Sequence, residues 1–415
     1  MMRSKTEQHV KRWKDQRWLI DTVIQAVGME WDQPRLNYTM YPAGVDAIGD
    51  FRTVGMRVRK FADMHREFAA AAHRREVKAQ GFEKQGRTVS ARESYFIAAL
   101  LYSAARWPIF ENNEKSIAYN ERMVACYDKF AAMMNRPVIR AEVPFEGKTL
   151  PGYLHLPHQP KSGEKFPVAI GIDGMDASKE IMCSMYGDKF LERGMAHFAY
   201  DGPGQGECTY RDILVTPTNH MDAARAVYDW LSRHPNIDTG RSVIWSVSMG
   251  SFFGLQAAAA LGDKVRGAAV TFVCHEPGLF SLMNRSAPSF KMRFMYMSGY
   301  ADEDEFDRFI EKFSLAPIAG DIKCPVLIQA GEDDELSPLE FSDELAGMIR
   351  SPKKLVIYEG ERHAIGGNNL SSALGENWFA MLADWCLDRI EGRPAPNERV
   401  FINALGQAKS EAYDT

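Results

Sequence analysis

The first third of the chain carries hydrophobic residues at helical spacing. Over 52–80, apolar side chains recur every three to four residues, as expected for one face of a helix. These side chains are Val54, Val58, Phe61, Met64, Phe68 and Ala72. A second helix is predicted over 91–107, with Ser90 and Glu93 giving a capping-box signal at its start. This helix is apolar on most faces, which predicts that it is packed on both sides.

The pattern changes at Pro137. A helix over about 115–134 stops before this proline, and short apolar strands then alternate with helices. The strands are predicted at 138–145, 150–156, 166–172, 197–200, 243–247, 265–273, 326–330 and 354–358. Such alternation requires a mostly parallel sheet covered by helices on both faces. The sequence therefore predicts an N-terminal helical domain at 1–136 and an α/β domain at 137–398.

Two further segments do not follow this alternation of strands and helices. Residues 276–320 are rich in Phe, Met and Tyr and follow the carboxyl end of a predicted strand. Ligands bind at that end of the strands in open α/β sheets, so we predict a lid-like insertion over the site. Residues 399–415 follow a last helix at 377–390 and a proline-rich stretch. We expect them to form a C-terminal tail.

Composition narrows the class of protein. Hydrophobic residues make up 45% and charged residues 25%, which is typical of a soluble globular protein. A net charge of −5 gives no reason to expect a nucleic acid or an anionic membrane as partner. The N-terminus lacks the apolar segment of a secretory signal, and the uncharged run at 95–105 is too short to span a bilayer. Six scattered cysteines without a C-x-x-C pair favour reduced thiols and a cytoplasmic location.

The most informative local feature is a serine at the end of an apolar strand. The run 243–247 stops at Ser248, and an alanine-rich helical run at 252–261 follows. A strand–serine–helix junction is typical of a nucleophile elbow, in which a strained turn lifts the hydroxyl out of the sheet. Ser246 stands at the first small position of the G-x-S-x-G pattern and Gly250 at the second. The alternative is a serine that merely caps a core helix.

A serine nucleophile needs a base to accept its proton and a carboxylate to orient that base. In α/β-hydrolases these follow the serine in the order acid, then histidine, on loops at the carboxyl edge of the sheet. An acidic turn after the strand at 326–330 offers Asp334 as the acid, with Asp333 as the second choice. His363 follows the next strand and is the only histidine downstream of these carboxylates. We therefore predict a triad of Ser248, His363 and Asp334.

The candidate oxyanion donors and substrate contacts lie at the same edge of the predicted sheet. An oxyanion hole requires two backbone N–H donors, which we assign to Met249, after the nucleophile, and to Met175, with Gly174 as the next choice. His275 and Glu276 end a strand at the mouth of the site. One of them is a candidate substrate contact, and a hydrogen-bonded structural pair is an equally good interpretation. We assign no metal and no cofactor.

A glycine-rich segment at 202–206 does not change this assignment. It lacks both the G-x-G-x-x-G spacing of a dinucleotide-binding loop and the lysine of a P-loop. Phosphate binding is therefore not expected. A tight turn below the active site is the better interpretation.

With these residues in place, the chain resembles the FrsA-like branch of the α/β-hydrolase superfamily, over about 88–389. The more specific motifs are at 87–93, 176–180, 193–196 and 201–207. The branch includes 2,6-dihydroxypseudooxynicotine hydrolase and fungal polyketide-shortening hydrolases. The resemblance implies a helical domain packed over the catalytic core with the active site between them, and often a dimer. It also supports the assigned triad and oxyanion donors.

These observations together predict a cofactor-free serine hydrolase. The expected reaction is cleavage of a carbon–carbon bond next to a carbonyl in a small aromatic or polyketide-like acyl compound. Ester hydrolysis, acyl transfer by the same acyl-enzyme, and a regulatory binding role on an inactive scaffold remain as alternatives. Aromatic residues of the insertion favour a flat apolar substrate, although they would also serve to pack the lid. They are Phe280, Phe290, Phe294, Tyr296 and Tyr300.

Overall fold

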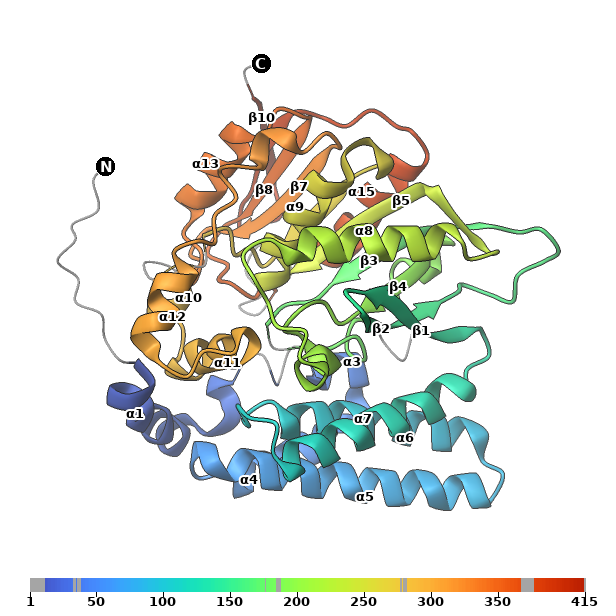
Figure 1. Ribbon diagram of the computed structural model, residues 1–415, viewed down its shortest axis with the longest axis vertical. Helices are drawn as coiled ribbons and strands as arrows, with labels where there is room; N and C mark the ends of the chain where they lie inside the picture. Colours follow the sequence, from blue (N-terminus) through green and yellow to red (C-terminus); the bar gives the residue numbers. More distant parts are fainter. Residues whose placement is uncertain are drawn as a thin grey trace.

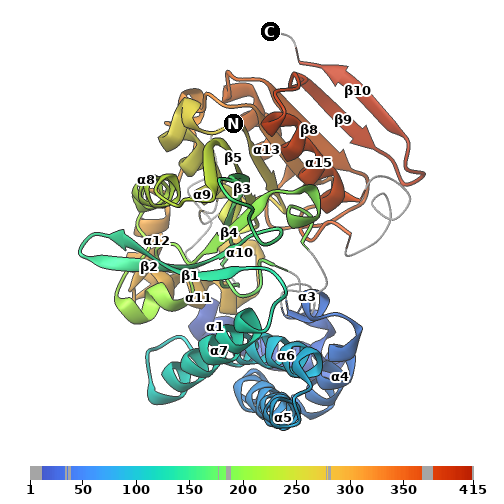
Figure 2. The ribbon, with the colours of Figure 1, turned by 90° about the vertical axis from the view of Figure 1, so that its right-hand side faces the viewer.

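A computed structural model of the chain shows a large twisted sheet above a layer of helices (Figure 1). The structure describes residues 12–32, 35, 39–175, 177–183, 188–276, 278, 282–366 and 377–413. The predicted contact residue Phe280 lies outside this part of the chain. The two views agree that the helices of the first third lie against one side of the sheet domain (Figures 1 and 2).

The N-terminal layer consists of helices only. They are α1 (Arg12–Val27), α3 (Tyr41–Ala43), α4 (Ile48–Arg57), α5 (Met64–Lys84), α6 (Thr88–Arg106) and α7 (Glu114–Ala132). Helix α6 lies between α5 and α7, and its residues from Ser94 to Arg106 are all buried, which confirms that it packs on both sides. The capping-box prediction is wrong: α6 begins at Thr88, so Ser90 lies inside the helix.

The sheet has the order β1-β2-β4-β3-β5-β6-β7-β8-β9-β10. Its strands are β1 (Val138–Phe145), β2 (Lys148–His155), β3 (Phe166–Ile172), β4 (Ala196–Tyr200), β5 (Ile237–Val247), β6 (Ala268–Thr271), β7 (Val326–Gly331), β8 (Lys353–Tyr358), β9 (Glu398–Ile402) and β10 (Ala408–Ala412). The strands from β4 to β9 are parallel to one another, and the hairpin β1–β2 and strand β10 are antiparallel to their neighbours. The mostly parallel sheet of an α/β-hydrolase fold is thereby confirmed.

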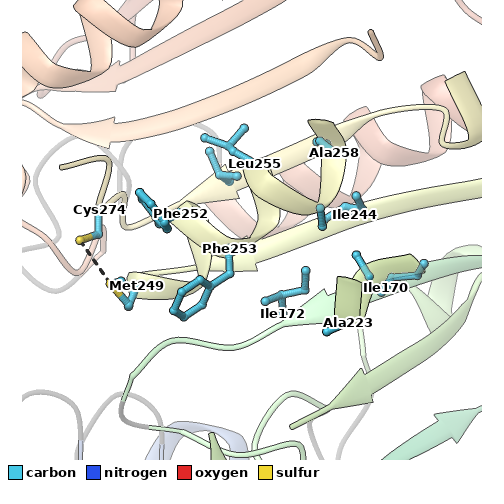
Figure 3. Close-up of a cluster of buried hydrophobic side chains, with 14 of the residues drawn as sticks. Ile170, Ile172, Ala223, Ile244, Met249, Phe252, Phe253, Leu255, Ala258 and Cys274 are labelled. Carbon is cyan, nitrogen blue, oxygen red and sulfur yellow. Dashed lines mark hydrogen bonds between the residues drawn. The ribbon is translucent and has the colours of Figure 1, made fainter. Parts of the chain in front are cut away.

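Helices cover both faces of this sheet. Helices α8 (Asn219–Ser232), α9 (Met249–Leu261) and α13 (Leu339–Met348) contribute to the core of one face, and α15 (Trp378–Ile390) covers the other. Helix α9 is buried over most of its length. Its side chains belong to one buried cluster with Ile170 and Ile244 of the strands, and Figure 3 shows Phe253 on the side of Ile172, with Phe252 and Leu255 on other sides of the helix. This packing fixes the start of α9, where Ser248 precedes it.

The C-terminal residues form strands where a tail is predicted. Val400 and Ile402 are buried on one face of β9, which extends the sheet beyond β8. All five residues of β10 are exposed, so this strand has no apolar alternation by which the sequence could reveal it. It is held by pairing with β9, and Tyr413 packs against the core.

The insertion after β6 forms three short helices beside α1 (Figure 1). They are α10 (Leu282–Arg285), α11 (Pro288–Ser298) and α12 (Glu303–Ile310). Phe294 is fully buried and meets Phe313 edge-on, with ring centroids 5.5 Å apart, while Phe313 also contacts Phe252 of α9. Phe313 thus links Phe294 of the insertion to α9 of the sheet domain.

Polar contacts tie the insertion to helix α1. The Arg12 guanidinium donates hydrogen bonds to the backbone carbonyls of Met283 and Ser286, at 2.9 and 2.6 Å. The Glu303 carboxylate accepts one from the amide of Trp13 at 3.2 Å and pairs with buried Lys291 at 3.1 Å. The donors of all these hydrogen bonds lie in α1 and the acceptors lie in the insertion, so the two segments form one structural unit.

Two predictions from the sequence concern membrane-spanning segments and the state of the cysteines. In the part that the structure describes, no helix is both long and apolar enough to cross a membrane. All six cysteines are buried and none forms a disulfide.

Buried histidines lead to a prediction about acid stability. Burial lowers the pKa of His220 to about 3, and the hydrogen bond from its ring to the carbonyl oxygen of Pro203 opposes this shift only in part. The ring stacks on Phe253, with the ring centroids 3.6 Å apart. Burial likewise lowers the pKa of His275 to about 3. In the unfolded chain a histidine titrates near 6.5, so below that pH the unfolded state takes up protons that the folded state cannot. The stability that each neutral, buried histidine contributes is therefore fully present above pH 6.5. It is lost progressively as the pH falls from 6.5 toward 3.

We therefore expect each of these histidines to lower the free energy of unfolding by about 2 kcal/mol when the pH falls from 7.5 to 5. Urea denaturation at a series of pH values measures this slope. Replacing His220 with Gln should reduce the slope, because the side chain that takes up the proton in the unfolded state is removed. An identical slope in the wild type and in His220→Gln would contradict the prediction.

Candidate active site

Ser248 occupies a strained turn between β5 and α9. Its backbone has φ 57° and ψ −131°, a region that costs a residue other than glycine about 1–3 kcal/mol. The turn is held on both sides: the Ser248 amide donates to the carbonyl of Thr271 at 3.1 Å, and the Ser248 carbonyl accepts from the amide of Ser251 at 2.8 Å. The turn therefore has the form that the sequence predicts for an elbow.

Close approach of α9 to the sheet explains the small residues around the serine. A Cβ atom on Gly250 would lie 2.4 Å from the carbonyl oxygen of Asp173 and 2.5 Å from that of Ile172. A Cβ atom on Gly254 would lie 2.2 Å from the hydroxyl oxygen of Ser246. The serine at the first small position of the elbow is thus accommodated because α9 presents a glycine to it.

The structure brings the three predicted triad side chains together. The Ser248 hydroxyl lies 3.0 Å from Nε2 of His363, and Nδ1 of the same ring lies 3.0 Å from Oδ2 of Asp334. The other carboxylate oxygen of Asp334 accepts hydrogen bonds from the amides of Leu336 and Ser337, at 2.8 and 2.9 Å. All three side chains are buried. The carboxylate is therefore fixed at one oxygen by the backbone and free to orient the ring with the other.

The loops after β7 and β8 meet too closely for any residue but glycine at one point. A Cβ atom on Gly331 would lie 2.3 and 2.4 Å from the backbone oxygens of Glu361 and Arg362. This approach places His363 beside the acidic turn. Asp333, the second choice for the acid, is exposed, and its amide donates to the carbonyl of Glu361.

The predicted oxyanion donors lie on either side of the serine turn. Met249 is the first residue of α9, where a backbone N–H has no acceptor within the helix. Met175 follows Gly174 in the loop after β3. A Cβ atom on Gly174 would lie 3.0 Å from Cβ of Ser248, so this loop runs directly against the nucleophile. No residue in the described ranges accepts a hydrogen bond from the Met175 amide.

His275 and Glu276 lie beside the acidic loop and the insertion. The His275 amide points at the hydroxyl of Ser337 at 3.4 Å, and burial keeps its ring neutral at pH 7 against the charge of Asp334. The Glu276 carboxylate accepts a hydrogen bond from the hydroxyl of Ser314 at 3.3 Å. Both line a small hollow that α13 closes. Their predicted contact with substrate stays a prediction.

Comparison with known proteins identifies the family. A sequence model described as "Esterase FrsA-like" matches residues 62–342, about two thirds of the chain. The chain belongs to the FrsA-like family. It is a hydrolase with the α/β-hydrolase fold, as its relatives are.

The relatives of this FrsA-like hydrolase include fungal and bacterial enzymes. An α/β-hydrolase named xenA from Xenoacremonium sinensis is 29% identical over 75% of this chain and 72% of its own length. The 2,6-dihydropseudooxynicotine hydrolase of Paenarthrobacter nicotinovorans is 28% identical over 73% of this chain and 78% of its own. The crystal structure of a 2,6-dihydroxy-pseudo-oxynicotine hydrolase superposes with a TM-score of 0.72 at 23% identity, over 86% of this chain and 97% of that one.

Beside the loop after β3 of this FrsA-like hydrolase lies a buried ionic network that the sequence analysis missed. The ammonium group of Lys179 is 2.6 Å from Glu180, 3.0 Å from Asp201 and 2.6 Å from Glu207. The Asp201 carboxylate also accepts hydrogen bonds from the amides of Lys179 and Glu207, both at 2.9 Å. Two of the family-specific motifs, at 176–180 and 201–207, thus interlock. The charged residues of these two motifs were the signal from which the sequence could have revealed the network.

The charges of this network are maintained by their neighbours. Burial opposes the charge on Lys179, but Asp201 and the two glutamates outweigh it and raise the pKa of the ammonium group. Burial would also raise the pKa of Glu207, but Lys179 and Arg140 lower it to about 2. Both groups are therefore ionised at neutral pH.

One group of described residues has atoms close enough to share a metal ion: Cys183, Asp188 and His197, within 4.8 Å of one another. The ring of His197 is already engaged on both sides. Its Nδ1 lies 2.8 Å from the Asp188 carboxylate, and its Nε2 accepts a hydrogen bond from the indole of Trp245 at 3.0 Å. With its lone pair occupied, His197 fits a hydrogen-bonded chain between β4 and β5 better than a metal ligand.

The ionic network leads to a prediction about stability. Lys179→Met leaves Glu180 and Asp201 buried without their cation, while Glu207 keeps Arg140 and Arg211. We therefore expect a loss of about 3–5 kcal/mol in the free energy of unfolding. Urea denaturation at pH 7.5 measures it. The matched control is Lys189→Met, which breaks an ion pair whose two side chains are both more than 40% exposed. That change should cost less than about 1 kcal/mol. Equal losses in the two variants would contradict a central role for the network.

Proposed function

We propose that Ser248, His363 and Asp334 form a catalytic triad, with which this hydrolase cleaves a carbon–carbon bond next to a carbonyl in an aromatic or polyketide-like acyl compound. The supporting observation is the continuous chain of 3.0 Å contacts from the serine hydroxyl through the imidazole to a carboxylate that two amides hold. The series of contacts starts at Ser248, in a strained elbow. A serine that only capped a helix would need neither the histidine nor the carboxylate.

The first half of the reaction follows from these contacts. The hydroxyl oxygen of Ser248 attacks the substrate carbonyl while Nε2 of His363 accepts its proton. Asp334 stabilises the resulting imidazolium through Nδ1. The amides of Met249 and Met175 donate hydrogen bonds to the tetrahedral oxyanion. The nucleophile and its base are thereby arranged before the substrate arrives.

The second half distinguishes the proposed reaction from simple ester cleavage. When the tetrahedral intermediate collapses, the bond from the carbonyl carbon to the ring or enolate carbon breaks, and His363 returns its proton to that carbon. A hydroxyl group ortho or para to the bond stabilises the leaving carbon by sharing its negative charge. Water, activated by the same histidine, then releases the acid from Ser248. Similarity to an enzyme named as a 2,6-dihydropseudooxynicotine hydrolase supports this version.

Ester hydrolysis is the second candidate, and the description of the family as esterase-like favours it. The same acyl-enzyme would form with an alkoxide or phenoxide as leaving group. An acceptor alcohol or amine in place of water would turn either reaction into acyl transfer. The leaving group and the acceptor, not the triad, decide among these outcomes.

Covalent labelling tests the nucleophile. A fluorophosphonate probe should modify Ser248 in the folded wild type, and peptide mass mapping should locate the adduct. Ser248→Ala should show no labelling, and His363→Gln should label at least about 10³-fold more slowly because the base is lost. The absence of an adduct on Ser248 of the folded wild type would favour a binding protein on an inactive hydrolase scaffold.

A panel of matched substrates tests the reaction. Aryl ketones with an ortho or para hydroxyl group should be cleaved, and their meta isomers should react at least about tenfold more slowly, because a meta hydroxyl cannot delocalise the leaving carbanion. Ser248→Ala should lower kcat by about 10⁴–10⁶-fold. Product analysis with and without added hydroxylamine separates hydrolysis from acyl transfer. Turnover of aryl esters with no turnover of any ketone would select the esterase instead.

A further inference from the structure

The glycine-rich turn after β4 contains a buried glutamine that holds the oxyanion loop. Gln205 lies in the segment 202–206, and its side chain is almost completely buried. Its Nε2 donates hydrogen bonds to the backbone carbonyls of Asp173 and Gly174, at 2.5 and 3.0 Å. Its Oε1 accepts one from the amide of Gly202 at 3.0 Å. We propose that Gln205 is the positioning residue that orients the Met175 amide toward the oxyanion, an inference that rests on the proposed function.

The three bonds fix the orientation of the glutamine amide. If its oxygen and nitrogen were exchanged, the oxygen would face the carbonyls of Asp173 and Gly174, and the NH₂ group would face the Gly202 amide. Both contacts would be repulsive, so one orientation is strongly preferred. The turn beneath it is also rigid. A Cβ atom on Gly206 would lie 2.1 Å from the Asp201 carboxylate, which Lys179 holds in place.

The geometry of the peptide bond transmits this orientation to the oxyanion site. The carbonyl of Gly174 and the N–H of Met175 belong to one planar trans peptide and point in opposite directions. Because Gln205 holds the carbonyl on its own side, the N–H is directed away from the glutamine. The same loop runs against Ser248, as the contact of Gly174 with the nucleophile shows. Rotation of this peptide would remove one of the two proposed oxyanion donors.

Such a residue affects the transition state and leaves ground-state binding largely unchanged. The oxyanion exists only once the serine has attacked, so a misdirected donor lowers kcat while KM stays nearly constant. Loss of one oxyanion donor costs about 10²–10³ in kcat in other serine hydrolases. A residue that only stiffened the turn would instead lower the melting temperature without this selective effect.

The decisive variant is Gln205→Glu, which keeps the shape but places a carboxylate against two carbonyl oxygens. Gln205→Met removes both donors without adding charge and serves if the first variant does not fold. The matched control is Gln256→Glu, since Gln256 is also buried and donates from Nε2 to a single backbone carbonyl, that of Pro217, at 2.5 Å. Thermal melting verifies that each variant is folded.

Three quantities are measured for each variant: kcat, KM and the inhibition constant of an aryl trifluoromethyl ketone, which forms a tetrahedral oxyanion on a serine. For the Gln205 variants we expect kcat and inhibitor affinity to fall together by about 10²-fold, with KM changed less than about threefold. Gln256→Glu should leave all three near their wild-type values.

Two outcomes would overturn the proposal. One is a folded Gln205 variant with kcat and inhibitor affinity within about threefold of the wild type. The other is a rise in KM with kcat unchanged, which would indicate a role in substrate binding or in loop stability. Failure of the proposed function has a different signature: Ser248→Ala would retain turnover, or the wild type would form no adduct with the trifluoromethyl ketone, whatever the Gln205 variants do.

Discussion

The catalytic edge of this protein depends on a buried lysine. Lys179 bridges the loop after β3 to the loop after β4 through Asp201 and Glu207, and none of the atoms involved has much access to water. Charges taken out of water are costly unless they are paired and hydrogen-bonded, so this contact tolerates few alternative geometries. The helical domain covers it, because Ala177 and Ile181 beside Lys179 belong to the hydrophobic core of that domain. A charged contact and an apolar core thus fix the same loop from two sides.

Glycines allow the neighbouring loops to approach one another closely at the candidate site. At Gly250 and Gly331 the backbone of a neighbouring loop lies where a side chain would begin, and at Gly174 the nucleophile itself does. These approaches bring the loops after β3, β5, β7 and β8 within hydrogen-bonding range at one edge of the sheet. The strain of φ 57° at Ser248 persists because the surrounding loops determine the turn.

The sequence predicts the fold well, and it also predicts that Ser248, Asp334 and His363 lie together, because both predictions follow from local order along the chain. Apolar runs predict the strands, and Ser248, Asp334 and His363 follow them in the one order that the fold permits. Other features depend on contacts between distant segments. Ser246 is tolerated in the elbow only because Gly254 faces it, and β10 forms only because β9 offers an edge. The roles of Lys179 and Gln205 also require knowing that two short motifs interlock.

The structure separates the candidate site from the insertion that follows β6. Ser248, His363 and Asp334 lie on loops that follow strands of the sheet, and the loop after β3 is held by the ionic network. The insertion is built differently: its charges, Lys291 and Glu303, bind to each other and to helix α1, and its aromatic side chains pack on α9. The contacts just named involve neither Ser248 nor His363, so the insertion and the candidate site are held in place by different residues.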